Sequence, residues 1–393
     1  AFGGKMKEKI ALVFSFILIF SFSAMDNSIS PMAKEISSHY YSDMDFVLKL
    51  ISVSTFFTVI GVFMGPWLLS KIKPYIVLLS ASFLILLSQL LFVFSNNIFS
   101  AFFSRIVAGF STGAIAGVMW WMSYHWISKN YYHYMIAVLV SARPLATALG
   151  VPASGLMAFS YSWTVPFLFL SVAVFVFGFF VSWVLKNGEK IEEKGLLRGY
   201  EDVLKVPYVK PFYLGFMINK MCYFGFYAVC GIWFIEHYGL NLKEISLSLL
   251  IIGIFEVMVN FTAGRLIKRF GFRNVFDKSV FLSFVLLIIF IWGKINIDIA
   301  VFLIAIFMLL DRIYSMAAVI KIPEMFKYEG NKTVFGSLNT LSMWLGLSII
   351  SAVSSRIISS IGIVWVEGVL LLCFIVGSSL MLYVNLKTIY KTI

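Results

Sequence analysis

The sequence predicts an all-α membrane protein with 12 transmembrane helices in two six-helix bundles, and three observations support this fold class. Of the 393 residues, 61% are apolar and 13% are charged, whereas soluble domains carry roughly 25% charged residues. The mean hydropathy is +0.94. Apolar runs of about 20 residues, long enough to cross a bilayer, recur along the whole chain. A soluble enzyme, a nucleic-acid binder and a disordered chain are therefore disfavoured.

Each apolar run is bounded by charged residues, Pro or Gly, and each is expected to be a helix because backbone groups in hydrocarbon must bond internally. The predicted spans cover residues 10–32, 46–69, 75–94, 98–126, 134–159, 163–185, 211–235, 245–265, 275–293, 297–320, 332–354 and 362–385.

The longest polar stretch divides these spans into two sets of six. We expect an N-terminal six-helix bundle over 6–185, a cytoplasmic linker over 186–210 and a C-terminal six-helix bundle over 211–393. The middle of the linker, 195–206, is expected to form a short amphipathic helix. Residues 1–5 precede a methionine and are expected to be a processing remnant.

The positive charges predict the topology. Most of the 31 Lys and Arg residues fall in segments that are cytoplasmic if the N-terminus is inside. Both termini are therefore predicted to be cytoplasmic, in a multi-pass protein of the cell membrane, with a bacterial inner membrane expected. The net charge of +12 is then mostly a topology signal, and no nucleic-acid partner is expected.

No pattern for catalysis or for a cofactor stands out. The three cysteines lie inside apolar runs and lack the spacing of metal ligands. The chain has no H-x-x-x-H and no P-loop. We therefore expect no enzyme activity, no metal and no cofactor.

The turn between spans 8 and 9 carries a recognisable motif. It reads GRLIKRFGFR over 264–273, and the equivalent turn between spans 2 and 3 keeps Gly65 and Lys71. This stretch resembles the G-x-L-x-D-R-x-G-R loop of the major facilitator superfamily, with Lys268 in place of the acid. In that family the loop helps to lock the outward-facing state, and the departure puts the strength of the lock in doubt.

Three further motifs narrow the resemblance to 12-span drug:proton antiporters and sugar-efflux-like permeases. Asp26 and Pro31 are similar to a D-x-x-x-x-P pattern in span 1, and Arg105 begins an R-x-x-x-G pattern in span 4. Span 5 resembles the antiporter motif in its G-V-P variant. The resemblance implies conformational roles for Gly65, Lys71, Gly150, Pro152, Gly155, Gly264, Arg269, Gly271 and Arg273.

Ionisable residues inside the spans are the candidate site. Each costs roughly 2.5–3.5 kcal/mol to insert at the centre of a span, so each needs a partner or a watery cavity. By counting residues from the span ends, the carboxylate in span 1 and the arginine in span 4 are expected to meet in the outer half. A set of salt bridges that only lock helices together is the alternative. The residues are Asp26, Arg105, Arg143, Lys220, Glu256, Asp311 and Arg312.

Four of these residues are cations and three are acids, which favours an anionic or zwitterionic substrate. In the family, spans 1, 4, 7 and 10 line the central cavity. The candidates for proton coupling are Asp26, Arg105, Glu256 and Asp311; those for substrate binding are Arg143, Lys220, Arg312, Tyr124, Tyr223 and Tyr227. Glu367 is expected to lie at the membrane interface. The glycines at 109, 113 and 117 are expected to allow close helix packing.

The function predicted is secondary active transport by alternating access. We expect proton-coupled efflux of a carboxylate metabolite or chelator by a monomer whose partners are the small-molecule substrate, protons and the lipid bilayer. Two alternatives stay open: a multidrug:proton antiporter for lipophilic compounds, and a proton-coupled importer of an organic anion.

Overall fold

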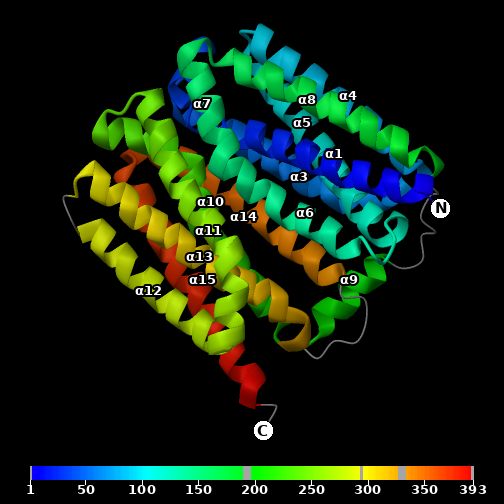
Figure 1. The fold of residues 1–393 in the computed structure, drawn as a ribbon. Helices are drawn as coiled ribbons and strands as arrows, with labels where there is room; N and C mark the ends of the chain where they lie inside the picture. Colours follow the sequence, from blue (N-terminus) through cyan, green and yellow to red (C-terminus); the bar gives the residue numbers. More distant parts are fainter. Residues whose placement is uncertain (1, 189–195, 293–294, 326–332, 391–393) are drawn as a thin grey trace. The chain divides into compact units, whose positions relative to one another are not determined.

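The computed structural model describes residues 2–188, 196–292, 295–325 and 333–390. Within these ranges the chain is helical and contains no β-strand (Figure 1). The chain divides into two compact units, which we call unit 1 (Ala1–Lys194 with Leu240–Leu247) and unit 2 (Gly195–Gly239 with Ser248–Ile393).

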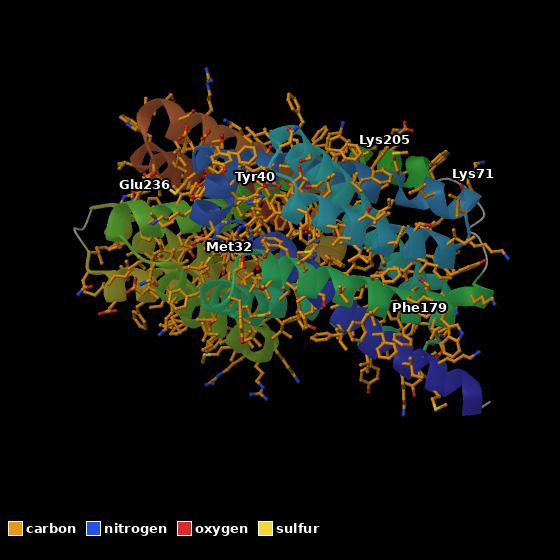
Figure 2. The ribbon with its side chains drawn as sticks, turned by 90° about the horizontal axis from the view of Figure 1, so that it is seen from above. Met32, Tyr40, Lys71, Phe179, Lys205 and Glu236 are labelled. Carbon is orange, nitrogen blue, oxygen red and sulfur yellow. The ribbon has the colours of Figure 1, made fainter. Side chains whose placement is uncertain are left out.

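Unit 1 is built around long helices that follow the predicted spans. α1 packs against α8, and α5 lies against both α3 and α4. Tyr40 is buried among the side chains of this unit, whereas Lys71, at the end of α3, is exposed (Figure 2). The helices are α1 (Phe2–Asn27), α2 (Ala33–His39), α3 (Asp45–Lys71), α4 (Pro74–Phe94), α5 (Ile98–Trp121), η1 (Met122–Trp126), α6 (Tyr132–Leu145), η2 (Ala146–Gly150), α7 (Val151–Ser160), α8 (Thr164–Val184) and η3 (Leu185–Asn187).

Glycines hold α3 and α5 together, as the four-residue spacing in span 4 predicts. A Cβ atom at Gly109 would lie 2.0 Å from the Ser54 carbonyl oxygen, and one at Gly113 would lie 2.4 Å from the Thr58 carbonyl oxygen. Only a residue without a side chain lets the two backbones approach this closely. The prediction of close helix packing is confirmed.

Two predicted spans differ from the structure in detail. Span 1 was expected to reach residue 32, but α1 ends at Asn27 and a turn containing Pro31 follows, because proline lacks the N–H that a continuing helix needs. Span 5 is helical but not regular. It consists of α6, the π-helical turn η2 and α7, and the N–H of Val151 bonds to the carbonyl of Ala146 five residues back.

Unit 2 contains the remaining helices, except that the first residues of α11, Leu242–Leu247, belong to unit 1. α11 begins with a capping box, in which the Asn241 N–H donates to Glu244 Oε2 at 2.9 Å and the Glu244 N–H donates to Asn241 Oδ1 at 3.1 Å. α10 packs against α14 and α15, and α12 packs against α13. The helices are α9 (Leu196–Lys205), α10 (Val209–Tyr238), α11 (Leu242–Phe270), α12 (Phe272–Trp292), α13 (Ile297–Met325), α14 (Thr333–Ile361) and α15 (Val364–Tyr390).

The predicted amphipathic helix in the linker is confirmed by α9. Its Val203 is buried, and Glu201 forms an exposed ion pair with Lys205 at 2.7 Å, so that the hydrogen bond from Lys205 lowers the pKa of Glu201. Residues 189–195 of the predicted linker lie outside the described residues.

All twelve predicted spans fall on helices, and nine stretches within the described residues are long and apolar enough to cross a membrane. The described residues of α11, α12 and α13, the helices over the eighth to tenth predicted spans, do not include such a stretch. The fold is thus an all-α membrane architecture. The number of crossings and the cytoplasmic position of both termini stay predictions.

Candidate functional site

Arg105 is the centre of a buried cluster in unit 1. It lies on α5, is 0% exposed, and its Nη2 donates to Gln89 Oε1 of α4 at 2.5 Å. The guanidinium carbon lies 4.0 Å from the ring centre of Phe92, also on α4, so the cation sits over an aromatic face. The backbone carbonyl of Phe92 in turn accepts a hydrogen bond from Tyr40. These contacts fix the arginine against α4.

Asp26 lies on the last turn of α1, where the charges of both Arg105 and Arg143 act on it. Its Oδ1 is buried and has no hydrogen-bond partner among the described residues. The neighbouring Asn27 donates to Thr147 Oγ1 at 3.1 Å and so connects α1 to η2. We define Asp26, Gln89, Arg105 and Arg143 as the arginine cluster.

Asp26 and Arg105 are the two residues that the count of depth expects to meet. The two residues come near each other, but no ion pair between them is formed in the described part of the chain. The physical reason is that Gln89 and Phe92 already hold the guanidinium from the α4 side. Asp26 is therefore one carboxylate facing two arginines.

We expect the substitution Gln89→Leu to lower the free energy of unfolding by about 1–3 kcal/mol, because Arg105 would lose its side-chain acceptor in a buried position. Thermal unfolding of the purified protein in detergent measures this. Ser88→Ala is the matched control, since the Ser88 hydroxyl bonds only within its own helix, to the Ile85 carbonyl at 2.7 Å. Equal loss in both variants would contradict the prediction.

A second polar cluster lies in unit 2, where Lys220 of α10 forms an ion pair with Asp311 of α13. The two side chains are buried, with residue exposures of 3% and 1%. The Tyr314 hydroxyl is within hydrogen-bond distance of Asp311 and of Asn219 Oδ1, the latter at 2.6 Å, and Asn219 Nδ2 donates to Ser378 Oγ of α15 at 2.9 Å. We define these five residues as the lysine cluster.

Glu256 of α11 is held by two tyrosines of α10. The Tyr223 hydroxyl lies 2.9 Å from both carboxylate oxygens, and the Tyr227 hydroxyl donates to Oε1 at 2.6 Å. The charge of Arg312 also acts on this carboxylate. The tyrosines predicted to contact substrate thus bind an acid of their own unit in this state.

The predicted site residues fall into separate groups. Arg143 lies in unit 1, whereas Lys220 and Arg312 lie in unit 2. Tyr124 is not brought near the arginine cluster: it belongs to η1 and packs on the rings of Trp120 and Tyr132, each at 5.9 Å. Nineteen residues of helix separate it from Arg105, or about 28 Å along the axis.

Four residues of the arginine and lysine clusters were not predicted as site residues from the sequence, and all four are uncharged. They are the polar side chains that bond the charged residues, namely Gln89, Asn219, Tyr314 and Ser378. One signal was available. Gln89 is an amide in the mostly apolar run of α4, where such a group needs a partner.

Comparison with known proteins decides the family. A family model described as the Major Facilitator Superfamily matches residues 12–323, which is most of the chain. The chain belongs to this superfamily. As a member of it, the protein is a multi-pass membrane transporter that handles small-molecule substrates, and not an enzyme. No curated protein matches the chain significantly in sequence.

Solved structures with the same fold include two transporters of the superfamily. One is a bacterial homolog of the human lysosomal transporter Spinster in an inward-facing, unoccupied conformation, with a TM-score of 0.74 and 11% identity over 98% of both chains. The other is the human organic anion transporter MFSD10 (TETRAN), with a TM-score of 0.70 and 12% identity, covering 95% of this chain and 99% of that one. At these identities the likeness concerns the fold alone.

The predicted conformational motifs of this superfamily member fall at helix ends and contacts. Gly271 joins α11 to α12 with φ of +78°, a left-handed conformation that favours glycine. A Cβ at Gly150 would lie 2.6 Å from the Cβ of Ala24 on α1. The surroundings of Gly264 and the side chain of Arg273 lie outside what the structure describes. Conformational roles for the motif residues stay a prediction.

Proposed function

We propose that this superfamily member is a proton-coupled secondary transporter that exports a small zwitterionic or anionic molecule by alternating access. In this proposal two six-helix bundles, over 6–185 and 211–393, rock about a midplane site, and a monomer works in the cell membrane. The observation that carries the proposal is Asp26, whose carboxylate has a buried oxygen without a partner in the described residues and faces two arginine charges.

The charge balance of the arginine cluster supports a substrate that carries a carboxylate. Two arginines face one acid, while Lys220 of the lysine cluster is already paired with Asp311. A carboxylate on the substrate would complement the excess guanidinium charge of Arg105 and Arg143. Arg143, which the sequence predicts to bind substrate, is the proposed anchor for the anion.

In this geometry, the charge of the substrate decides whether substrate and proton cross the membrane in opposite directions or together. If the substrate also carries an ammonium group, that group and a proton compete for Asp26, and competition between substrate and proton is what exchange across the membrane requires. A simple anion gains when Asp26 is protonated, because one negative charge is removed. It would then travel together with the proton. A zwitterion thus favours efflux by antiport, and a simple anion favours import by symport.

We expect two probes of nearly equal shape to separate these cases. Iminodiacetate carries two carboxylates and an ammonium group, and glutarate replaces the nitrogen by carbon. Thermal-shift measurements on the purified protein in detergent report binding, since a ligand of the folded state raises Tm. We expect iminodiacetate to stabilise the protein more above neutral pH than below it, and glutarate to show the opposite trend or no binding.

Substitutions of Asp26 and Arg143 test whether these two side chains cause the pH dependence and the binding of the probes. Asp26→Asn is expected to abolish the pH dependence for both probes and to stop proton movement coupled to iminodiacetate, followed with a pH dye in proteoliposomes. Arg143→Ala is expected to weaken both probes by about tenfold, the loss of one charge-assisted bond. Asp45→Asn is the control, because Asp45 forms an ion pair with exposed Lys49 at 2.9 Å. Stabilisation by tetraphenylphosphonium alone would contradict the proposal and favour a multidrug antiporter.

A further inference from the structure

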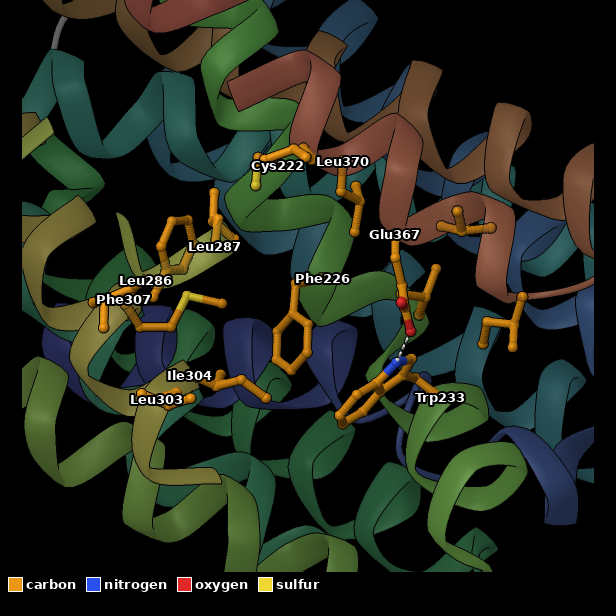
Figure 3. A pocket seen from close by; sticks show the side chains of 15 residues that line it. Cys222, Phe226, Trp233, Leu286, Leu287, Leu303, Ile304, Phe307, Glu367 and Leu370 are labelled. Atoms are coloured by element: carbon orange, nitrogen blue, oxygen red, sulfur yellow. Dashed lines mark hydrogen bonds between the residues drawn. The ribbon is translucent and has the colours of Figure 1, made fainter. Parts of the chain in front are cut away.

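A pocket lies within unit 2, and its described lining includes none of the charged residues of the candidate site. α10 packs closely against α15, and α12 packs closely against α13, while the contact between α12 and α15 is slight. The pocket occupies the seam between these two helix pairs, with about 680 Å³ of empty space including its open mouth (Figure 3). We call it the seam pocket.

The seam pocket uses a different face of α10 from the polar clusters. Cys222, Phe226, Val229 and Trp233 line it at spacings of four, three and four residues, which is one side of a helix. The first and last of them are eleven residue steps apart, or about 16 Å along the axis. The polar residues Lys220, Tyr223 and Tyr227 are not among the lining residues. The pocket is therefore a long apolar slot separate from the candidate transport site.

One end of the slot carries a carboxylate. Among the described lining residues, Glu367 alone is charged. Its Oε1 accepts from Trp233 Nε1 at 2.6 Å, drawn as the dashed line in Figure 3, and lies 3.1 Å from Nε2 of His237. No described residue bonds Oε2, and the side chain is 21% exposed. Trp233 and His237 thus orient the carboxylate through Oε1, and Oε2 is available to accept a hydrogen bond from a ligand.

The surroundings indicate where an occupant would come from. Leu282 of α12 lies one helical turn from the lining residue Leu286, and Leu372 of α15 follows the lining residue Leu371; they are 50% and 59% exposed. In a membrane transporter such side chains face lipid hydrocarbon. A molecule that enters the seam pocket from there must offer a hydrocarbon chain to the slot and a cationic N–H donor to Glu367.

We propose that the seam pocket binds one acyl chain of an amine-headed phospholipid whose ammonium group donates to Oε2 of Glu367. Phosphatidylethanolamine has this chemistry. Phosphatidylcholine has the same charge on its head group but no N–H donor, and phosphatidylglycerol has no cation. The site goes beyond the proposed transport function and does not depend on it.

Native mass spectrometry of the purified protein, titrated with dioleoyl phosphatidylethanolamine, phosphatidylcholine or phosphatidylglycerol, tests the proposal. We expect about tenfold tighter binding of the ethanolamine lipid than of the other two, the size of one charge-assisted hydrogen bond. Glu367→Gln keeps an oxygen for Trp233 and is expected to remove the preference while some lipid still binds. Equal binding of the three lipids by the wild-type protein would overturn the proposal.

A neighbouring pair of residues provides a matched test of the slot itself. Leu371 lines the pocket, whereas Leu372 is exposed and does not. Leu371→Trp is expected to reduce binding of the ethanolamine lipid about tenfold by filling the slot, and Leu372→Trp to leave it unchanged. The same loss in both variants would show that the lipid binds elsewhere. Asp26→Asn is expected to keep the lipid preference, so failure of the transport proposal would be seen separately.

Discussion

Replacement of Lys220 by Met is expected to destabilise the protein by about 3–5 kcal/mol, because Asp311 would stay buried without its ion-pair partner. The hydrocarbon part of methionine is close in size to that of lysine, so the loss reports the charge and not a cavity. Thermal unfolding in detergent, supported by the yield of monodisperse protein, measures the effect.

The double variant Lys220→Met with Asp311→Asn separates pairing from packing. It is expected to recover most of the lost stability, because no uncompensated charge is left in the cluster. Lys205→Met is the surface control. Lys205 and its partner Glu201 are both more than half exposed, so loss of this ion pair should leave the stability nearly unchanged. Losses that simply add in the double variant would contradict the prediction.

The substitution Gly109→Ala is the second change with a large expected effect. Its Cβ would lie 2.0 Å from the Ser54 carbonyl oxygen, which belongs to the backbone of α3 and cannot rotate away. α3 and α5 would have to separate, and we expect a destabilisation of about 3 kcal/mol or more, at the upper end for overpacking. Thermal unfolding and the fraction of protein that elutes as a single species report it.

Gly368→Ala, at the start of α15, is the matched control because a Cβ there meets nothing within 4 Å. This change is expected to be neutral or to stabilise the protein by about 0.5–1 kcal/mol, since alanine favours the helix more than glycine does. The same change from glycine to alanine is thus expected to lower the stability at position 109 and to keep or raise it at position 368. A mild effect at both positions would show that α5 can shift away from α3.

The helices could be predicted because the bilayer allows few alternatives. An apolar run of twenty residues such as 75–94 must be a helix, and α4 covers Pro74–Phe94. The ends were less predictable. α1 ends at Asn27, and no glycine or proline at that position marks the end in the sequence. Pro31 cannot continue a helix, but it lies four residues further along and does not tell at which earlier residue the helix stops.

Charged residues inside the spans could also be found by inspection, but their partners could not. Counting residues gives the depth of a side chain in the membrane and says little about the direction it faces. Depth placed Asp26 near Arg105, and the structure brings them within electrostatic range. The hydrogen bond of Arg105 to Gln89 depends on how α4 and α5 are rotated against each other, which only packing decides.

The tyrosines of α10 illustrate the same limit. Their spacing of four residues correctly put Tyr223 and Tyr227 on one side of the helix. Both tyrosines donate to Glu256 of α11. This depends on how α10 and α11 pack against each other, which cannot be read from the sequence of either helix.

The π-helical turn η2 has a consequence for the length of the chain. A deletion of one residue from a regular helix rotates everything beyond it by about 100°. A π turn already accommodates one residue in excess of an α turn. Removal of a single residue between Ala146 and Gly150 would therefore leave Arg143 and Gly155 on their present sides of the span. This short stretch is the place in span 5 where related chains can differ by one residue in length and still present the same surfaces.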